Sequence, residues 1–139
     1  MTIISTIAYV GDLRTSSIHR RSGEHINTDA PVDNNGRGAY FSPTDLIANS
    51  LGSCMITLMG ITAEKHEIQL GEISAEIGKV MESNPRRVAE IDVYLKIEDL
   101  NFSEREKNIL ETAAINCPVA KSLHPNIVQS VEFNYFVND

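Results

Sequence analysis

Two cysteines are the residues of this sequence best suited to covalent chemistry. Cys54 lies in the stretch SPTDLIANSLGSCMITLMGITAEK, and Cys117 lies in NCPVAKSL, 63 positions further along the chain. A cysteine acts as a nucleophile only as the thiolate, so its pKa must be lowered by a cation or by a helix N-terminus. Two cysteines at this separation form neither a zinc cluster nor a C-x-x-C redox loop. In a reducing compartment they can equally be two small buried apolar residues, and this alternative stays open.

Cys54 needs a cation from another part of the chain if it is to react. It lies about eleven residues into a predicted helix, where the helix dipole has faded. Four arginines precede this helix, Arg14, Arg20, Arg21 and Arg37. Arg14, at the end of the first predicted strand, is the best placed of the four by topology, although residue types alone do not decide among them.

Cys117 stands directly before Pro118, which can open a new helical turn. The free backbone N–H groups of that turn can stabilise a thiolate, and a cysteine at a chain break can move toward another sulfur. The alternative is that Cys117 only fills a corner between helices. Local sequence favours neither reading.

The stretch Ser42–Lys65 predicts a long helix that positions Cys54. Ser42 is the expected N-cap, Pro43 the first helical residue and Asp45 the partner in a capping box. One apolar stripe contains Ile47, Leu51, Cys54, Leu58 and Ile61. The opposite side is also uncharged, and its Met55 and Met59 are candidates for core packing or for an apolar wall that faces substrate. We therefore expect the helix to be enclosed nearly all round, with part of the wall supplied by a partner subunit.

The remaining pattern predicts an α+β fold. Strands are expected at 2–10, 15–20, 24–30, 73–77, 91–97 and 127–137, and a second capped helix from Ser103 toward Cys117. The order is β-β-β-α-β-β-α-β, with a long central helix. At 139 residues, without repeats or linkers, the chain is expected to form one domain, 1–139.

Composition excludes several classes of function. A net charge of −7 argues against a nucleic-acid partner. The N-terminus lacks a secretory pattern, so a cytoplasmic protein is expected. The uncharged stretch 46–63 is near the minimum length of a membrane span, but its Asn, Ser and Thr residues favour a core helix and no membrane association. The four histidines are scattered without ligand spacing, so no metal site and no cofactor are expected.

The segments SPTDLIANSLGSCMITLMG and AAINCPVAKSL together resemble the OsmC/Ohr family, the osmotically inducible and organic hydroperoxide resistance proteins. The shared features are a thiol on the long helix after an S-P-x-[ED]-L start, a second thiol in a C-P-V motif, and their separation. The predicted order of elements fits as well, so the resemblance covers essentially the whole chain. It implies an OsmC-like fold and an intertwined homodimer whose active sites are built by both subunits.

The resemblance also implies a cysteine-based peroxidase. Cys54 matches the peroxidatic thiol, which attacks a small hydroperoxide and becomes a sulfenic acid. Cys117 matches the resolving thiol, which forms a disulfide with it. A lipoyl-linked or thioredoxin-like dithiol would restore the pair. Arg14 is matched to the activating arginine of the family.

One position departs from the family pattern. The hydroperoxide-resistance branch has a glutamate directly after the proline, which orients the arginine, and here that position is Thr44. The acid comes one residue later, at Asp45, which can complete the capping box or reach Arg14. Thr44 favours an alternative function, a non-catalytic dimeric binding or stress-response protein with an apolar ligand cleft near Met55 and Met59. A redox sensor that uses the same disulfide is a third hypothesis.

Overall fold

The computed structural model describes residues 1–138, which fall into two compact units. The first unit is Met1–Ile47, and the second covers 48–138. Each unit contains one three-stranded sheet. The boundary lies within the first turns of the long helix, so this helix belongs to both units. The single domain expected over 1–139 stays a prediction.

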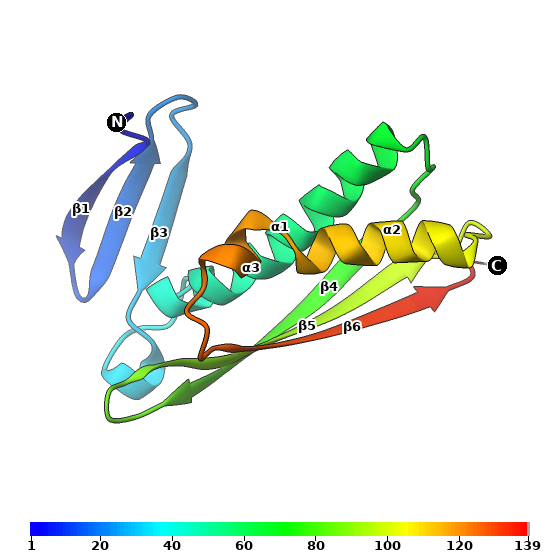
Figure 1. The fold of residues 1–139 in the computed structure, drawn as a ribbon. Coiled ribbons are helices and arrows are strands. Elements are labelled where there is room, and N and C mark those ends of the chain that lie inside the picture. The colour runs from blue at the N-terminus through cyan, green and yellow to red at the C-terminus, as the bar shows by residue number, and fades with distance from the viewer. Residues whose placement is uncertain (139) are drawn as a thin grey trace. The chain divides into compact units, whose positions relative to one another are not determined.

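The first unit is an antiparallel meander of β1 (Ser5–Gly11), β2 (Arg14–His19) and β3 (His25–Asp29), in that order across the sheet (Figure 1). The connection from β1 to β2 is tight, and its Asp12 and Leu13 both have positive φ. A short 3-10 helix, η1 (Val32–Asn34), follows in the loop. The three predicted strands are confirmed, with bounds shifted by a few residues.

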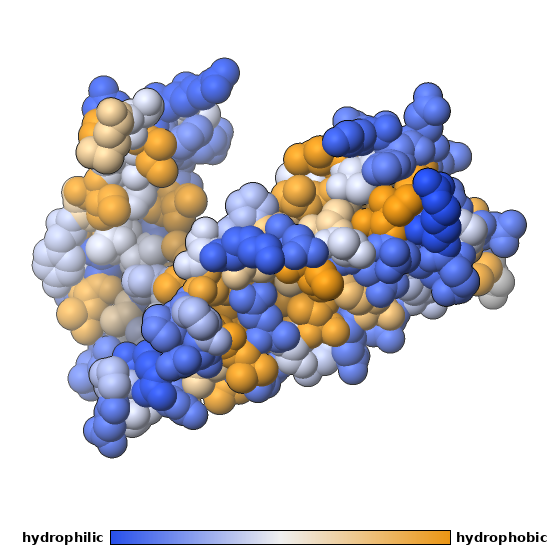
Figure 2. Space-filling view, in the orientation of Figure 1, coloured by the Kyte–Doolittle hydropathy of each residue, from blue (hydrophilic) through white to orange (hydrophobic). Residues whose placement is uncertain are grey.

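The first unit buries polar side chains and leaves its apolar ones open. Its buried residues are Thr28, Asp29 and Ser42, whereas Ile7 keeps 69% of its surface exposed and Ile26 keeps 55%. Figure 2 shows hydrophobic side chains on the visible surface of this unit. The meander therefore has no hydrophobic core of its own, and an open three-stranded sheet of this kind needs an apolar cover to be stable in water.

The long helix α1 (Pro43–Lys65) begins as the sequence predicts. The Ser42 Oγ accepts the Asp45 N–H at 3.0 Å, and the Asp45 carboxylate accepts the Ser42 N–H at 2.9 Å. Both bonds of a capping box are thus formed, and Pro43 occupies the first helical position, where a missing N–H costs nothing. By length and composition α1 passes as a membrane span, yet one side of it lies in a protein core.

The second unit packs helices onto one face of a mixed sheet (Figure 1). Its strands are β4 (Ile73–Glu82), β5 (Arg87–Glu98) and β6 (Val128–Phe136), and β5 lies in the middle. The hairpin of β4 and β5 is antiparallel, as predicted, and β6 runs parallel to β5. A parallel neighbour requires a crossover, which α2 (Glu104–Ile115) and α3 (Pro118–Ser122) provide.

The core of the second unit lies between α1, α2 and this sheet. From the sheet it takes the alternate residues of β5, and from α1 the buried side chains of Ala48, Leu51, Met55, Met59 and Ala63. Gly52 allows the close approach, because a Cβ atom there would collide with the Ile77 side chain. Burial of these side chains supplies most of the hydrophobic stabilisation of the chain.

The buried face of α1 differs from the predicted stripe. Of the stripe residues, Leu51 is fully buried, Cys54 and Leu58 are half-buried, and Ile47 and Ile61 are exposed. The helix is therefore covered on one side of the single chain and is not enclosed all round. The partner subunit that we expected to supply the missing wall stays a prediction.

Candidate functional site

Cys54 occupies the middle of α1 and is half-buried. It packs against the edge of the core, whereas Met55, the next residue, points into the core and has no exposed surface. The helix begins at Pro43, about three turns earlier, so its N-terminal N–H groups cannot act on the Cys54 thiol. A cation that lowers the pKa of this thiol has to come from another element.

Cys117 lies where α2 ends and α3 begins, and it is fully buried. It is the N-cap of α3, and its Sγ accepts the Ala120 N–H at 3.5 Å. Pro118 stands at the first position of α3, so the helical turn predicted after Cys117 is present. The local sequence thus places the thiol at the break between two helices, where a backbone N–H group donates to it.

The two thiols, distant in sequence, meet in the second unit. Burial is the main cause that raises the pKa of the Cys117 thiol above its ordinary value of 9.0, and the Ala120 N–H opposes it. The neighbouring Cys54 side chain raises this pKa further. Both cysteines are in the thiol state, with no disulfide between them. Two neighbouring thiols of this kind can be oxidised to a disulfide.

Arg14 is held in the first unit by Asp29. Its Nε donates to Asp29 Oδ1 at 2.6 Å and its Nη2 to Oδ2 at 2.9 Å, a bidentate pair between the adjacent strands β2 and β3. The Ala39 N–H donates to the same carboxylate at 3.0 Å. The guanidinium also lies over the Tyr40 ring, 4.6 Å from its centroid. The bond from Arg14, and more weakly the one from Ala39, lowers the pKa of Asp29 from 3.8 to about 2, although burial opposes the shift.

The helix start is engaged in its own hydrogen bonds. Asp45 completes the capping box with Ser42, and the Thr44 hydroxyl lies 3.2 Å from the Ser42 hydroxyl. The carboxylate on Arg14 comes instead from the end of β3. Of the two roles expected for Asp45, the structure shows the capping role.

Sequence reasoning missed Asp29, although a signal was present. The hairpin predicted around residues 22–23 places the end of the third strand beside the start of the second, and the structure pairs Arg14 with Asp29 in this register. Opposite charges directly across two strands stabilise each other. A search of the predicted hairpin for such cross-strand pairs would have found this carboxylate.

The structure distributes the expected site residues over both units. Cys54 and Cys117 come together in the second unit, and Arg14 lies in the first with its carboxylate partner. The pairing of Arg14 with Cys54 stays a prediction. Met55 and Met59 have no exposed surface and belong to the core, which is the core-packing alternative. A direct contact with substrate would require this core to open.

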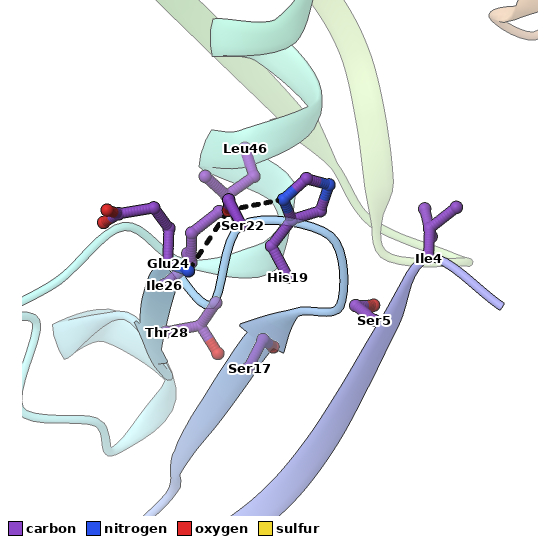
Figure 3. A pocket seen from close by; sticks show the side chains of 9 residues that line it. All are labelled: Ile4, Ser5, Ser17, His19, Ser22, Glu24, Ile26, Thr28 and Leu46. Atoms are coloured by element: carbon purple, nitrogen blue, oxygen red, sulfur yellow. Dashed lines mark hydrogen bonds between the residues drawn. The ribbon is translucent and has the colours of Figure 1, made fainter.

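A pocket with mostly apolar walls lies on the N-terminal sheet (Figure 3). Its volume is about 520 Å³, and its lining includes Ile26, Thr28 and Leu46, all from the first unit. Side chains alternate between the two faces of a sheet. Arg14 and Asp29 are one residue out of phase with Thr28, so they lie on the opposite face. The pocket and the ion pair are therefore separate features.

The OsmC-like protein family model matches residues 36–132, well over half of the chain. The chain belongs to the OsmC-like protein family. The matched range includes both cysteines, the helix start and the C-P-V motif. No curated protein sequence matches the chain.

Solved structures agree with this OsmC-like assignment. A protein of Psychrobacter arcticus, assigned as an osmotic stress induced and detoxification response protein, is 46% identical, with a TM-score of 0.90 over 96% of this chain and 97% of that one. An organic hydroperoxide resistance protein of Legionella pneumophila is 15% identical, with a TM-score of 0.76 over 96% and 97% of the two chains. One from Elizabethkingia anophelis is 18% identical, with a TM-score of 0.73 over 98% and 97%.

These likenesses confirm two of the sequence-based predictions, the family and the α+β OsmC-like fold. The last two structures, because of their low identity, support the fold alone. The OsmC-like fold is a soluble one, in which α1 is a core helix rather than a membrane span. Among residues 1–138, no group of three or more His, Cys, Asp or Glu side chains is arranged to hold a metal ion.

Proposed function

We propose that this OsmC-like protein is a thiol-dependent peroxidase that reduces organic hydroperoxides or related peroxides through Cys54 and Cys117. The observation that carries the proposal is that two elements far apart in sequence place Cys54 near enough to Cys117 to raise its pKa. Two cysteines placed only for packing have no need to be neighbours. Membership of the family, and the fold shared with proteins named for hydroperoxide resistance, support the same assignment.

The reaction balances with two thiols and one peroxide. The Cys54 thiolate attacks one peroxide oxygen, the O–O bond breaks, and with one proton the products are a Cys54 sulfenic acid and an alcohol. The Cys117 thiol then condenses with the sulfenic acid, which forms the disulfide and releases water. An external dithiol, lipoyl-linked or thioredoxin-like, reduces the disulfide by exchange and is itself oxidised.

The environments of the two thiols suit this order of events. Cys54 is half-buried, so a small peroxide can reach it more easily than it can reach the fully buried Cys117. The pKa of Cys117 is raised, so this thiol stays protonated at neutral pH and is inert until a sulfenic acid forms beside it. We assign the activation of Cys54 to Arg14, whose charge is permanent.

The working form that we propose is a homodimer in the cytoplasm. The apolar side chains left open on the first unit and on α1 support this assembly, because a second copy would remove them from water. Small hydroperoxides are the substrates, and the dithiol reductant is the other partner.

Peroxide titration with intact-mass readout tests the proposed function. One equivalent of cumene hydroperoxide should convert the wild type into an intramolecular disulfide, with a loss of about two daltons as two thiol hydrogens leave. Cys117→Ser should stop at a Cys54 sulfenic acid that reacts with dimedone. Cys54→Ser, the matched control, should consume no peroxide. The proposal fails if both thiols of the wild type stay unchanged under excess cumene and fatty-acid hydroperoxides.

A further inference from the structure

The ion pair of Arg14 and Asp29 is built more rigidly than a surface salt bridge. The Asp29 side chain has no exposed surface, and the Arg14 side chain keeps only 20% of its own. Two parallel N–H···O bonds fix the guanidinium plane, and the Tyr40 ring lies against it. Bidentate bonds of this kind set orientation as well as energy. A buried carboxylate that lost its cation would be left uncompensated, so the pair is expected to stay closed.

The neighbouring backbone also holds Asp29 in place. Its carboxylate accepts the Ala39 N–H, and its own N–H donates to the Phe41 carbonyl at 3.2 Å. Ala30 N–H donates to the Leu13 carbonyl at 3.0 Å, beside the turn from which Arg14 emerges. The end of β3, the start of β2 and the loop before α1 therefore form one cluster, and the guanidinium is its charged centre.

This geometry leaves one edge of Arg14 for another acceptor. Asp29 takes the Nε and Nη2 edge of the guanidinium, so Nη1 is the nitrogen whose donors are directed away from the pair. An arginine locked on one edge presents the other in a fixed direction. Such preorganisation is what a group needs to stabilise a thiolate or a peroxide oxygen without reorganising during the reaction.

We infer that Asp29 is the positioning residue for Arg14 in this chain, a role that the helix start cannot provide with Thr44. The inference rests on the proposed function, since it assigns Arg14 to the activation of Cys54. Asp29 acts through Arg14 and touches neither thiol nor substrate. It follows that Thr44 does not weaken the site, because the carboxylate that orients the arginine comes from β3.

A double-mutant cycle on the full-length protein tests this inference. The measured quantity is the second-order rate constant for oxidation of Cys54 by cumene hydroperoxide. Asp29→Asn keeps the shape and removes the charge, and it should lower this rate constant by about 10- to 100-fold, the scale of a displaced catalytic group. Arg14→Gln should lower it similarly. In the Arg14→Gln background, Asp29→Asn should cause no further loss, because its effect passes through Arg14.

One further variant serves as a control, and another replaces Asp29→Asn if that variant does not fold. Glu82→Gln removes an exposed carboxylate that pairs with Arg87, at 2.5 Å, and should leave the rate constant unchanged. Circular dichroism checks that Asp29→Asn is folded. If it is not, Asp29→Glu takes its place, since it keeps the charge but displaces the guanidinium by one methylene. It should lower the rate constant in the wild-type background only.

The outcomes separate this inference from the proposed function. If wild-type Cys54 does not react with peroxides, the peroxidase proposal fails, and the same cycle is run on the rate of Cys54 alkylation by iodoacetamide, which reports the thiolate fraction. The Asp29 inference is overturned if the Cys54 of the Asp29→Asn variant reacts with the same rate constant as that of the wild type. It is also overturned if Asp29→Asn slows the reaction equally with and without Arg14, because this would show a structural role only.

Discussion

Asp29 and Cys117 are held in opposite protonation states by their surroundings. The bond from Arg14 lowers the pKa of Asp29 to about 2, so this carboxylate is ionised throughout the neutral range. Burial raises the pKa of Cys117, so this thiol stays protonated there. The first unit thus contains an ion pair that persists at neutral pH, that of Arg14 and Asp29. The second unit contains the protonated thiol of Cys117 beside the more accessible thiol of Cys54. The raised pKa of Cys117 favours Cys54 as the first thiol to react in the proposed function.

The shifted pKa of Asp29 predicts a pH dependence of stability. A carboxyl group whose pKa is lower in the folded state adds stability above its unfolded pKa, here 3.8, and this contribution disappears as the pH falls toward about 2. Asp29→Asn should therefore lower the free energy of unfolding near neutrality, and the gap to the wild type should narrow below pH 3.8. Urea unfolding over this range measures the gap. A gap that stays constant with pH would contradict the assignment.

At the residue scale, the sequence predicts two candidate thiols and a candidate arginine, but not the carboxylate that binds this arginine. Cys54 and Cys117 carry distinctive chemistry and occur in recognisable motifs, whereas residue types alone do not separate Arg14 from three other arginines. Asp29 is an ordinary acid near the end of a strand, and only the register of β2 and β3 brings it to Arg14. Such a partner depends on three-dimensional pairing, which local sequence patterns express weakly.

At the scale of elements, the N-cap of α1 defines where the Cys54 helix begins. Both hydrogen bonds of the capping box are buried or half-buried, and Ser42 is only 2% exposed. The first helix of the crossover, α2, also has a capping box, formed by Ser103 and Glu106. Since four N–H groups at a helix start lack intrahelical partners, each box satisfies donors that would otherwise be unpaired.

Removal of the α1 cap should destabilise the protein. Ser42→Ala deletes the acceptor of the Asp45 N–H and should lower the free energy of unfolding by about 1 kcal/mol. Ser53→Ala, on the exposed side of the same helix, is the matched control and should have little effect, since alanine is the better helix former. Urea unfolding measures both. Equal losses in the two variants would show that the cap does not contribute.

Helix starts were predictable from sequence, whereas the buried side of α1 was not. Ser42 and Ser103 mark the starts of their helices, because each forms a capping box with an acidic residue three positions later. The middle of α1 has no charge on any side, so periodicity gives no direction for the core. On the buried side, Gly52 leaves room for the Ile77 side chain of the sheet to pack closely against the helix. Packing against the sheet therefore selected a face that apolar periodicity alone did not distinguish.

At the scale of the whole molecule, the two units differ in what they bury. All buried hydrophobic side chains of residues 1–138 lie at or after Ala48. The first unit contributes an ion pair and a polar interior, and α1 leaves Ile47 and Ile61 exposed on the side nearest to Cys54 in helical phase. Apolar surface of this extent on both units is what an obligate interface with a second copy would remove from water.

The exposed side of α1 therefore predicts a homodimer that one charge can weaken. Sedimentation at micromolar concentration should give twice the 15.4 kDa chain mass for the wild type. Ile61→Glu places a carboxylate on this side, where Ile61 is 54% exposed in the single chain, and should shift the mass toward one chain because an unpaired charge is costly to bury. Ile61→Ala adds no charge and should keep the dimer. A wild type that sediments as a single chain would contradict the expected assembly, and the apolar sides of both units would then need another cover.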